Sequence, residues 1–282
     1  TIRDPNNYTD YKNAVIKLTS GGILDTNFDT DGIATNFFNK RDTQNNLIID
    51  PLNGVEFKPY VTDILLQSDG NVLLMAGGNY PKTAFISLNR STGAWNNSFS
   101  TDGINIIDSS YASCFTTDSS GNIFLLGRGQ NQDTTVVTKL DQNADVVNSF
   151  GINGSIAFHS NSNIGQLGSN YPDGIISDGT NGLFVYGINS YYFSGLSYDP
   201  KVINNSGGYI ARLNSSGLDI GFGSSGTGLV NFNSDVRSVT INSTGIFVGT
   251  FGGIFGLQNG AGYSNPTNNT PGLITNLLAS VN

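Results

Sequence analysis

The chain has 282 residues, of which 37% are hydrophobic and only 12% are charged, and its formal net charge is -8 at pH 7. Binding to nucleic acid needs clustered basic side chains, whereas the 13 Lys and Arg residues are scattered here, so we exclude that partner class. No apolar run approaches the roughly 18 residues that span a bilayer, and we expect no membrane partner. The 36 Gly residues, together with abundant Asn, Ser and Thr, favour turns over helices and indicate an all-β chain.

The first predicted element is the strand Val15 to Leu18, followed by a turn and by Phe28 and Gly32. The same phrase begins three more times, at Phe85, Val137 and Ile210. In every copy a Phe follows the turn and a Gly stands four residues after it: Phe28 and Gly32, Phe99 and Gly103, Phe150 and Gly154, Phe222 and Gly226. This pattern predicts a strand, a turn, a Phe that fills the core beneath the turn, and a Gly where the backbone reverses.

A second phrase consists of a turn that ends in Gly and then a short, continuously apolar strand. Its turn glycines recur at intervals of 51, 61 and 63 residues, at Gly70, Gly121, Gly182 and Gly245. The strands that follow begin at Val72, Ile123, Leu183 and Ile246. Consecutive apolar residues of this kind predict strands that are covered on both faces.

Together the two phrases predict repeat units near 14–37, 61–107, 112–158, 173–232 and 236–257, with the first and last incomplete. We therefore predict a β-propeller of about four blades over residues 1–257, closed by pairing of the N- and C-terminal half-blades. A competing arrangement remains open, because Gly253 to Leu257 could supply a third strand to the last unit itself. Residues 258–282 are predicted to be a Gly/Asn/Pro linker and a short apolar tail.

The stretches Ile210 to Gly223 and Leu65 to Leu73 resemble the delta-sixty repeat, whose units read roughly R-L-N-x-D-G-x-L-D-x-x-F-G and L-Q-x-D-G-K-I-L-V-x-G. The resemblance covers most of residues 14 to 251 and is loosest in the third copy, at Asn143 to Asp145. It implies a propeller-like array of the kind found in large bacterial surface and secreted proteins and in some phage proteins. It implies no catalytic motif.

The residues themselves offer little chemistry. Cys114 and His159 are the only residues of their types, and we interpret them as a buried, inert thiol and a surface histidine. Asp29 to Gly32 resembles the start of a calcium loop, but no Glu follows at the twelfth position, and we favour a structural turn. We therefore predict no catalytic residues, no metal and no cofactor.

Two segments depart from the repeat: Asn39 to Tyr60, which we interpret as a plain linker, and the more informative insertion from Asn189 to Ser206. Its aromatic side chains and acidic group are what a sugar face or a protein interface needs, and we predict a ligand-binding set of Tyr191, Tyr192, Phe193, Tyr198 and Asp199. The alternative interpretation is that these aromatics fold back and cap the propeller.

We expect a non-catalytic structural or binding module, located on a virion, as a tail or fibre component, or on a bacterial surface. Its expected partners are other virion or surface proteins, a host glycan recognised during adhesion, and a second copy of the chain. The alternative function is a propeller enzyme that acts on carbohydrate, which would need two opposed carboxylates at one mouth of the ring.

Overall fold

The structure is a computed structural model, and it describes residues 2–3, 11–35, 60–77, 82–100, 102–108, 112–129, 134–159, 168–179, 182–191, 207–223, 226–232, 234–242, 245–250 and 253–257. Every element named in these ranges is a β-strand, and the paired strands are antiparallel, which confirms the all-β prediction. The chain forms two compact units, residues 1–110 with 141–145 and residues 111–140 with 146–282. Each unit is described separately below.

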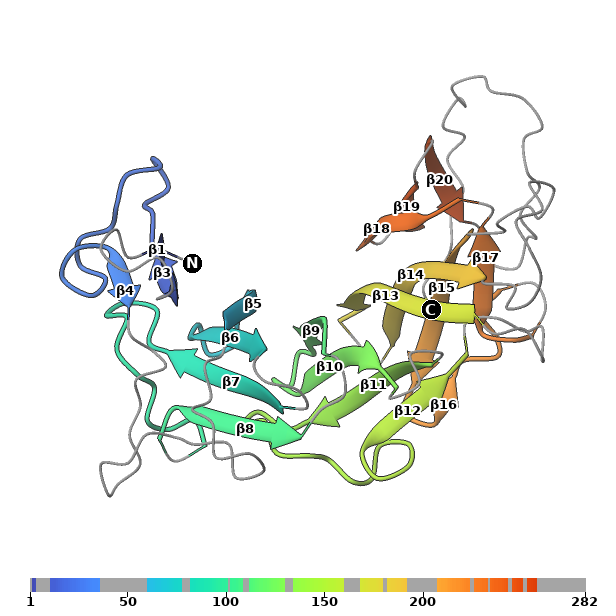
Figure 1. The fold of residues 1–282 in the computed structure, drawn as a ribbon, viewed down its shortest axis with the longest axis horizontal. Helices are drawn as coiled ribbons and strands as arrows, with labels where there is room; N and C mark the ends of the chain where they lie inside the picture. Colours follow the sequence, from blue (N-terminus) through green and yellow to red (C-terminus); the bar gives the residue numbers. More distant parts are fainter. Residues whose placement is uncertain are drawn as a thin grey trace, which may run out of the picture. The chain divides into compact units, whose positions relative to one another are not determined.

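The first unit contains two short strand pairs and one four-stranded meander (Figure 1). The pairs are β1 (Ile2–Arg3) with β2 (Tyr11–Lys12) and β3 (Ala14–Ile16) with β4 (Ile33–Thr35). The meander has the order β5 (Tyr60–Leu66), β6 (Val72–Gly77), β7 (Lys82–Leu88) and β8 (Ile104–Asp108).

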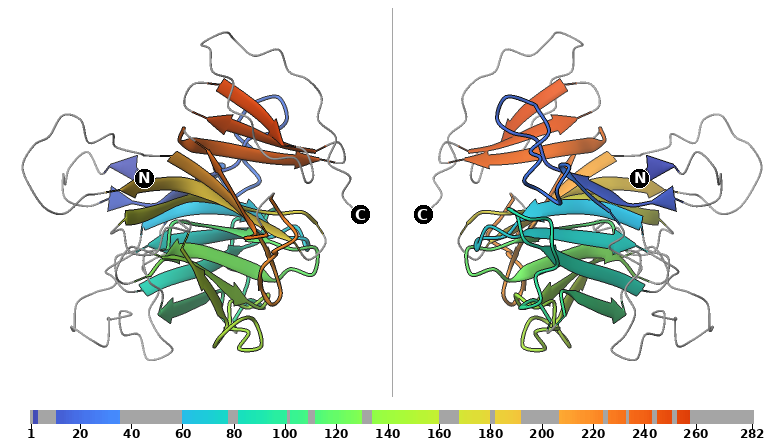
Figure 2. Two further views of the ribbon diagram at one scale, coloured as in Figure 1. Left: turned by 90° about the vertical axis from the view of Figure 1, so that its right-hand side faces the viewer. Right: turned by 90° about the vertical axis from the view of Figure 1, so that its left-hand side faces the viewer.

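The second unit contains three further sheets, whose antiparallel strands are seen from two sides in Figure 2. The first is the meander β9 (Cys114–Thr117), β10 (Ile123–Arg128), β11 (Thr135–Leu140) and β12 (Ser155–Phe158). The second is built from β13 (Gly168–Ser177), β14 (Leu183–Tyr191), β15 (Gly207–Asn214), β16 (Gly217–Leu218) and β17 (Leu229–Phe232), with both β16 and β17 paired to β15. The third is β18 (Val236–Asn242), β19 (Gly245–Thr250) and β20 (Gly253–Leu257).

The apolar strands of the second phrase are covered on both faces in β6, β10 and β14, as predicted, whereas Phe247 of β19 is only half-buried. In β14, Leu183 and Val185 join the cluster shared with the sheet β9–β12, whereas Phe184 between them joins the cluster shared with β18 and β19. Alternate side chains of a strand point to opposite faces, so a strand packed on both sides must be apolar at consecutive positions.

The repeat phenylalanines fill the core beneath their turns, which confirms that part of the prediction. Phe28, Phe99, Phe150 and Phe222 are 1%, 3%, 4% and 7% exposed. In each copy the Phe backbone N–H donates to the carbonyl three residues earlier, so the same turn holds the ring in place: Asp25, Asn96, Val147 and Asp219 accept these bonds.

The fourth reversal glycine was predicted wrongly. The backbone N–H groups of Lys17, Ser87 and Lys139 bond to the carbonyls of Gly32, Gly103 and Gly154, but the equivalent Arg212 bonds to Gly228 and not to Gly226. The turn after Phe222 is longer than the others, so the constant offset of four residues fails in this copy.

The last sheet differs from the predicted pairing. Along β19, β18 lies on one side and β20 on the other, so the third strand of this sheet is Gly253–Leu257 and not the N-terminal strand β3. Within the first unit, β3 and β4 instead contribute Val15 and Ala34 to a core with the meander β5–β8.

Candidate functional site

The first strand of three sheets, namely β5, β13 and β18, carries a β-bulge at the same point. The ladder shifts between Val61 and Asp63 in β5, between Pro172 and Gly174 in β13, and between Val236 and Ser238 in β18. The bulged residues are Thr62, Asp173 and Arg237, and Ser113, directly before β9, occupies the equivalent place. A bulge leaves one residue unpaired and turns its side chain in a new direction.

In two sheets the residue at this position bonds to the backbone of the neighbouring strand. The hydroxyl of Thr62 donates to the carbonyl of Met75, and that of Ser113 donates to the carbonyl of Leu126, both at 3.3 Å. These two carbonyls belong to equivalent positions of β6 and β10. The ordinary role of the position is therefore structural.

In the next two sheets the same position is charged, and its occupants face each other. Nη1 of Arg237 lies 3.6 Å from Oδ2 of Asp173, and Nη2 of Arg237 lies 2.8 Å from Oδ2 of Asp235. The side chain of Asp173 is 32% exposed and that of Arg237 is 55% exposed, so a ligand in solution can reach both.

An aromatic and a second cation extend this group. The guanidinium of Arg128, at the end of β10, lies 4.2 Å from the ring centroid of Tyr171 in β13, a close cation–π stack. We call Arg128, Tyr171, Asp173, Asp235 and Arg237 the rim cluster. Two cations and two carboxylates balance its charge, and its fixed planar donors, acceptors and ring suit a polyhydroxylated ligand.

The rim cluster holds one carboxyl group in an unusual electrostatic state. Burial raises the pKa of Asp173 above its ordinary value, and the negative charge of Asp235 adds to this rise. The charges of Arg237 and Arg128 oppose the rise without cancelling it. Carboxyl groups perturbed by both burial and neighbouring charges gather at functional sites.

Packed aromatic residues support the rim cluster from behind. Tyr186 lies close against Gly174, where a Cβ atom would collide with its ring, and burial raises the pKa of Tyr186. The fully buried Tyr209 forms a 2.8 Å hydrogen bond with the buried Thr135, and its burial raises its pKa strongly. The first contact holds β14 against β13, and the second joins β15 to β11.

Of the predicted binding residues, one lies within the described residues. Tyr191 is the last residue of β14 and pairs with Gly168, whereas Tyr192, Phe193, Tyr198 and Asp199 lie outside the described residues. The insertion leaves β14 and returns at β15 at the sheet end where Ile188 pairs with Tyr171. The sequence-based prediction did not include any residue of the rim cluster.

The other sequence-based candidates have structural roles. The Oδ1 atom of Asp31 accepts the N–H of Ile33 at 2.9 Å, which is the turn predicted in place of a calcium loop. Cys114 is half-buried, and its thiol lies 3.8 Å from the carbonyl of Asp173. His159 is exposed.

The described part of the chain contains neither a metal-binding group nor a membrane-crossing helix. No group of three His, Cys, Asp or Glu side chains in this part of the chain is placed to hold a metal ion. None of its segments forms a helix with the length and hydropathy required to cross a membrane.

Comparison with known protein families and with curated proteins gives no match for this chain.

Proposed function

We propose that this chain is a non-catalytic binding module of a virion tail or fibre, or of a bacterial surface, and that its rim cluster contacts a glycan. The observation that carries the proposal is the pairing of Asp173 with Arg237 at two bulge positions that elsewhere hold backbone-bonded hydroxyl groups. A partly exposed ion pair adds little to the stability of a fold. Replacing a backbone-bonded hydroxyl group at this position by a charged side chain therefore does not stabilise the protein. Binding of a ligand would explain why Asp173 and Arg237 stand at these positions in place of hydroxyl residues.

The insertion supports the same surface. β14 ends at Tyr191 and β15 begins at Gly207, and residues 192–206, which carry most of the aromatic side chains predicted to bind, connect these two strand ends. Glycan recognition combines ring stacking with a few directed hydrogen bonds, and these two elements supply both. A neighbouring protein subunit would use the same donors and rings.

We further propose that the repeat sheets belong to one closed propeller. The proposal is supported by the regular antiparallel units, by the core that each sheet of the second unit shares with the next, and by the contribution of β3 and β4 to the core of the first meander. Because β20 already pairs with β19, the N-terminal strands of such a ring would adjoin β20 and would not replace it.

One observation favours the alternative of a carbohydrate-active enzyme. Asp173 has a raised pKa and Asp235 is a second carboxylate beside it, which is the chemistry that a glycosidase pair requires. However, Arg237 is ion-paired to both carboxylates, which leaves neither one as an unengaged nucleophile or acid. The non-catalytic proposal therefore agrees better with the geometry.

The test is binding of the full chain to a glycan array and to host cells, with Arg237→Gln and Asp173→Asn compared with wild type. Each variant removes charge-assisted hydrogen bonds, so we expect about tenfold or greater loss of binding. The matched control is Arg212→Gln, which removes an arginine of β15, in the sheet that contains Asp173; the partners of this arginine are Asp178 and Asp219. Equal binding by Arg237→Gln and wild type would reject the rim cluster, and glycan cleavage abolished by Asp173→Asn would establish the enzyme instead.

A further inference from the structure

A second site is suggested by a break in the polar pairing that the repeat maintains elsewhere. The third residue of the first phrase is Lys17, Ser87, Lys139 or Arg212 in successive copies. A residue across the following turn donates its backbone N–H to the carbonyl of this third residue, and in three copies it also supplies a side-chain partner. Lys17 pairs with Asp25 at 2.8 Å, Ser87 accepts a 3.1 Å bond from Asn96, and Arg212 lies 3.4 Å from Asp219.

The third copy lacks this partner. Val147 stands where Asp25, Asn96 and Asp219 stand in the other copies, and its N–H donates to the carbonyl of Lys139 at 3.0 Å. Its side chain can offer Lys139 no oxygen atom. In the first copy, by contrast, the hydrogen bond from Lys17 lowers the pKa of Asp25.

In this copy a second acceptor, Asp118, bonds to groups other than the lysine. Gln67 accepts from Ser87 at 3.2 Å, and Asp178 lies 3.4 Å from Arg212. The equivalent Asp118 instead accepts 2.9 Å bonds from the N–H groups of Ser120 and Asn122 and a 2.7 Å bond from the Asn122 amide. Within the described part of the chain, the contact found for the Lys139 ammonium is the Phe124 ring, 5.3 Å from its centroid.

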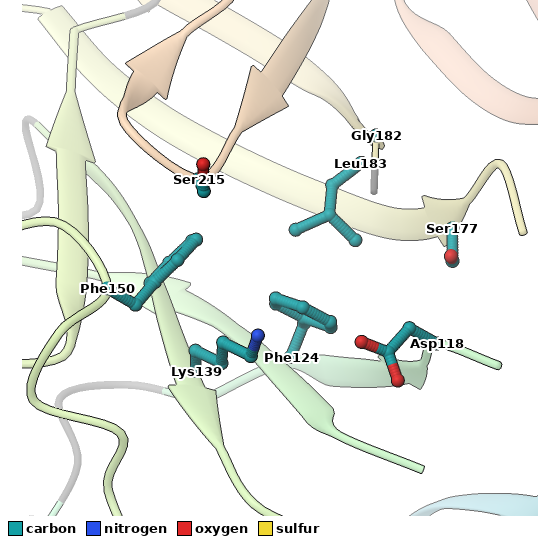
Figure 3. A pocket seen from close by; sticks show the side chains of 8 residues that line it. All are labelled: Asp118, Phe124, Lys139, Phe150, Ser177, Gly182, Leu183 and Ser215. Atoms are coloured by element: carbon teal, nitrogen blue, oxygen red, sulfur yellow. The ribbon is translucent and has the colours of Figure 1, made fainter. Parts of the chain in front are cut away.

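The unmatched lysine lines a recess between the sheet β9–β12 and the sheet β13–β17. The cavity has a volume of about 220 Å³, and Figure 3 shows Lys139 and Asp118 on either side of Phe124, with Leu183 and Ser177 on the facing sheet. Phe150 packs edge-on against Phe124 at 5.8 Å between ring centroids and completes the apolar side. The recess lies at the end of these sheets opposite the rim cluster, because β10 begins beside Asp118 and ends at Arg128.

We propose that this recess binds a neutral sugar ring through two of its hydroxyl groups. A hydroxyl group accepts a hydrogen bond from Lys139, as Asp25 and Asp219 do for their cations, and its neighbour donates to Asp118. The apolar C–H face of the ring lies against the phenylalanine side. A carboxylate or phosphate group could also bind Lys139. However, its negative charge would lie beside Asp118, and this repulsion disfavours an anionic ligand.

The proposal does not depend on the rim cluster, since the two surfaces share no residue. Loss of glycan binding through Arg237 and loss of sugar binding through Lys139 are therefore separable results. Comparison of the repeat copies also suggests a substitution that would block sugar binding in the recess. Val147→Asp restores the acid found in the first and fourth copies, so Lys139 gains an internal partner while every recess-lining side chain stays in place.

The experiment is ligand-observed saturation-transfer NMR on the full chain with glucose, galactose, mannose and N-acetylglucosamine. Glucuronate and glycine serve as anionic and zwitterionic comparators. Wild type should bind at least one neutral sugar, and Val147→Asp and Lys139→Gln should each weaken that binding about tenfold or more. Lys17→Gln, which removes the equivalent but paired lysine, should leave it unchanged.

Circular dichroism melts of each variant separate loss of binding from loss of fold. Should Val147→Asp unfold the chain, Lys139→Gln alone decides, because Lys139 is only half-buried. The proposal is overturned if no neutral sugar binds, if both recess variants bind as wild type does, or if glucuronate or glycine binds more strongly than every neutral sugar.

Discussion

Arg237 lies 3.6 Å from Asp173 across two neighbouring sheets, and each of the two residues occupies the β-bulge of its own strand. The pair joins β13 to β18 at a point where neither backbone ladder makes a bond. Its two members also face solvent, so its electrostatics can be measured directly.

We expect Arg237→Gln to raise the pKa of Asp173 further above its ordinary value. The guanidinium is the strongest influence that opposes the effect of burial on this carboxyl group, and its removal leaves burial and Asp235 unopposed except by Arg128. Titration of the Asp173 carboxyl carbon by NMR measures the change, and Arg212→Gln should leave this pKa where it is. A lower pKa for Asp173 in Arg237→Gln would contradict the assigned pairing.

The raised pKa of Asp173 also predicts how the stability of the wild-type protein depends on pH. A carboxyl group whose pKa is raised by folding binds more protons in the folded than in the unfolded state between its two pKa values. The contribution of Asp173 to stability is therefore largest at pH below its unfolded pKa and is lost as the pH rises through its folded pKa. Denaturant unfolding of wild type and Asp173→Asn across this range should show that the difference in unfolding free energy shifts in favour of the variant as the pH rises.

Replacing a repeat phenylalanine by alanine should destabilise the fold by about 3 to 5 kcal/mol, because each ring is almost fully buried. The variants are Phe28→Ala, Phe99→Ala, Phe150→Ala and Phe222→Ala, and chemical denaturation gives the free energies. Losses below about 1 kcal/mol at two of the four positions would mean that these rings do not support the core as described.

Gly228→Ala should destabilise the protein more than Gly226→Ala. Both glycines have positive φ, 73° and 66°, so alanine is strained at either position by about 1 kcal/mol. At Gly228 the new Cβ would also lie 3.0 Å from the carbonyl oxygen of Asp219, whereas at Gly226 no atom lies within 4 Å. Thermal melts of the two variants decide which glycine serves the reversal, and a larger loss at Gly226 would restore the sequence-based assignment.

Deleting residues 1–37 should lower the melting temperature and promote self-association. The deletion removes Val15, Phe28 and Ala34 from the core of the first meander, and it removes the hydrogen bond from Asp29 N–H to the Thr92 carbonyl. In a closed ring it also opens a sheet edge, which invites pairing with other chains. Circular dichroism and size-exclusion chromatography report the two effects, and a monomer with an unchanged melt would count against ring closure.

The sequence predicted the strands well because their signals are local. Consecutive apolar residues such as Leu183, Phe184 and Val185 require two covered faces, and a Phe after each turn requires a buried place beneath it. The longer turn after Phe222 was missed, since a spacing rule taken from three copies contains no information about an inserted residue in the fourth.

The rim cluster could not be found in this way because its members come from three strands that are distant in sequence. Arg128, Tyr171 and Arg237 carry no shared motif, and the bulges that orient Asp173 and Arg237 appear only in the strand register. A signal was nevertheless present. Aligning the repeat copies places Thr62, Ser113, Asp173 and Arg237 in one column, where a change from hydroxyl to charge is visible.

The apolar clusters of the second unit each draw on two successive sheets, and this has a mechanical consequence. One cluster joins β9–β12 to β13–β17, and another joins β13–β17 to β18 and β19. A pulling force applied at the C-terminal end would therefore detach the sheet β18–β20 first. This would expose Phe184, Ile210 and Phe222 while the cluster between β9–β12 and β13–β17 is still intact. We therefore expect the second unit to unfold in steps, one sheet at a time, under such a force.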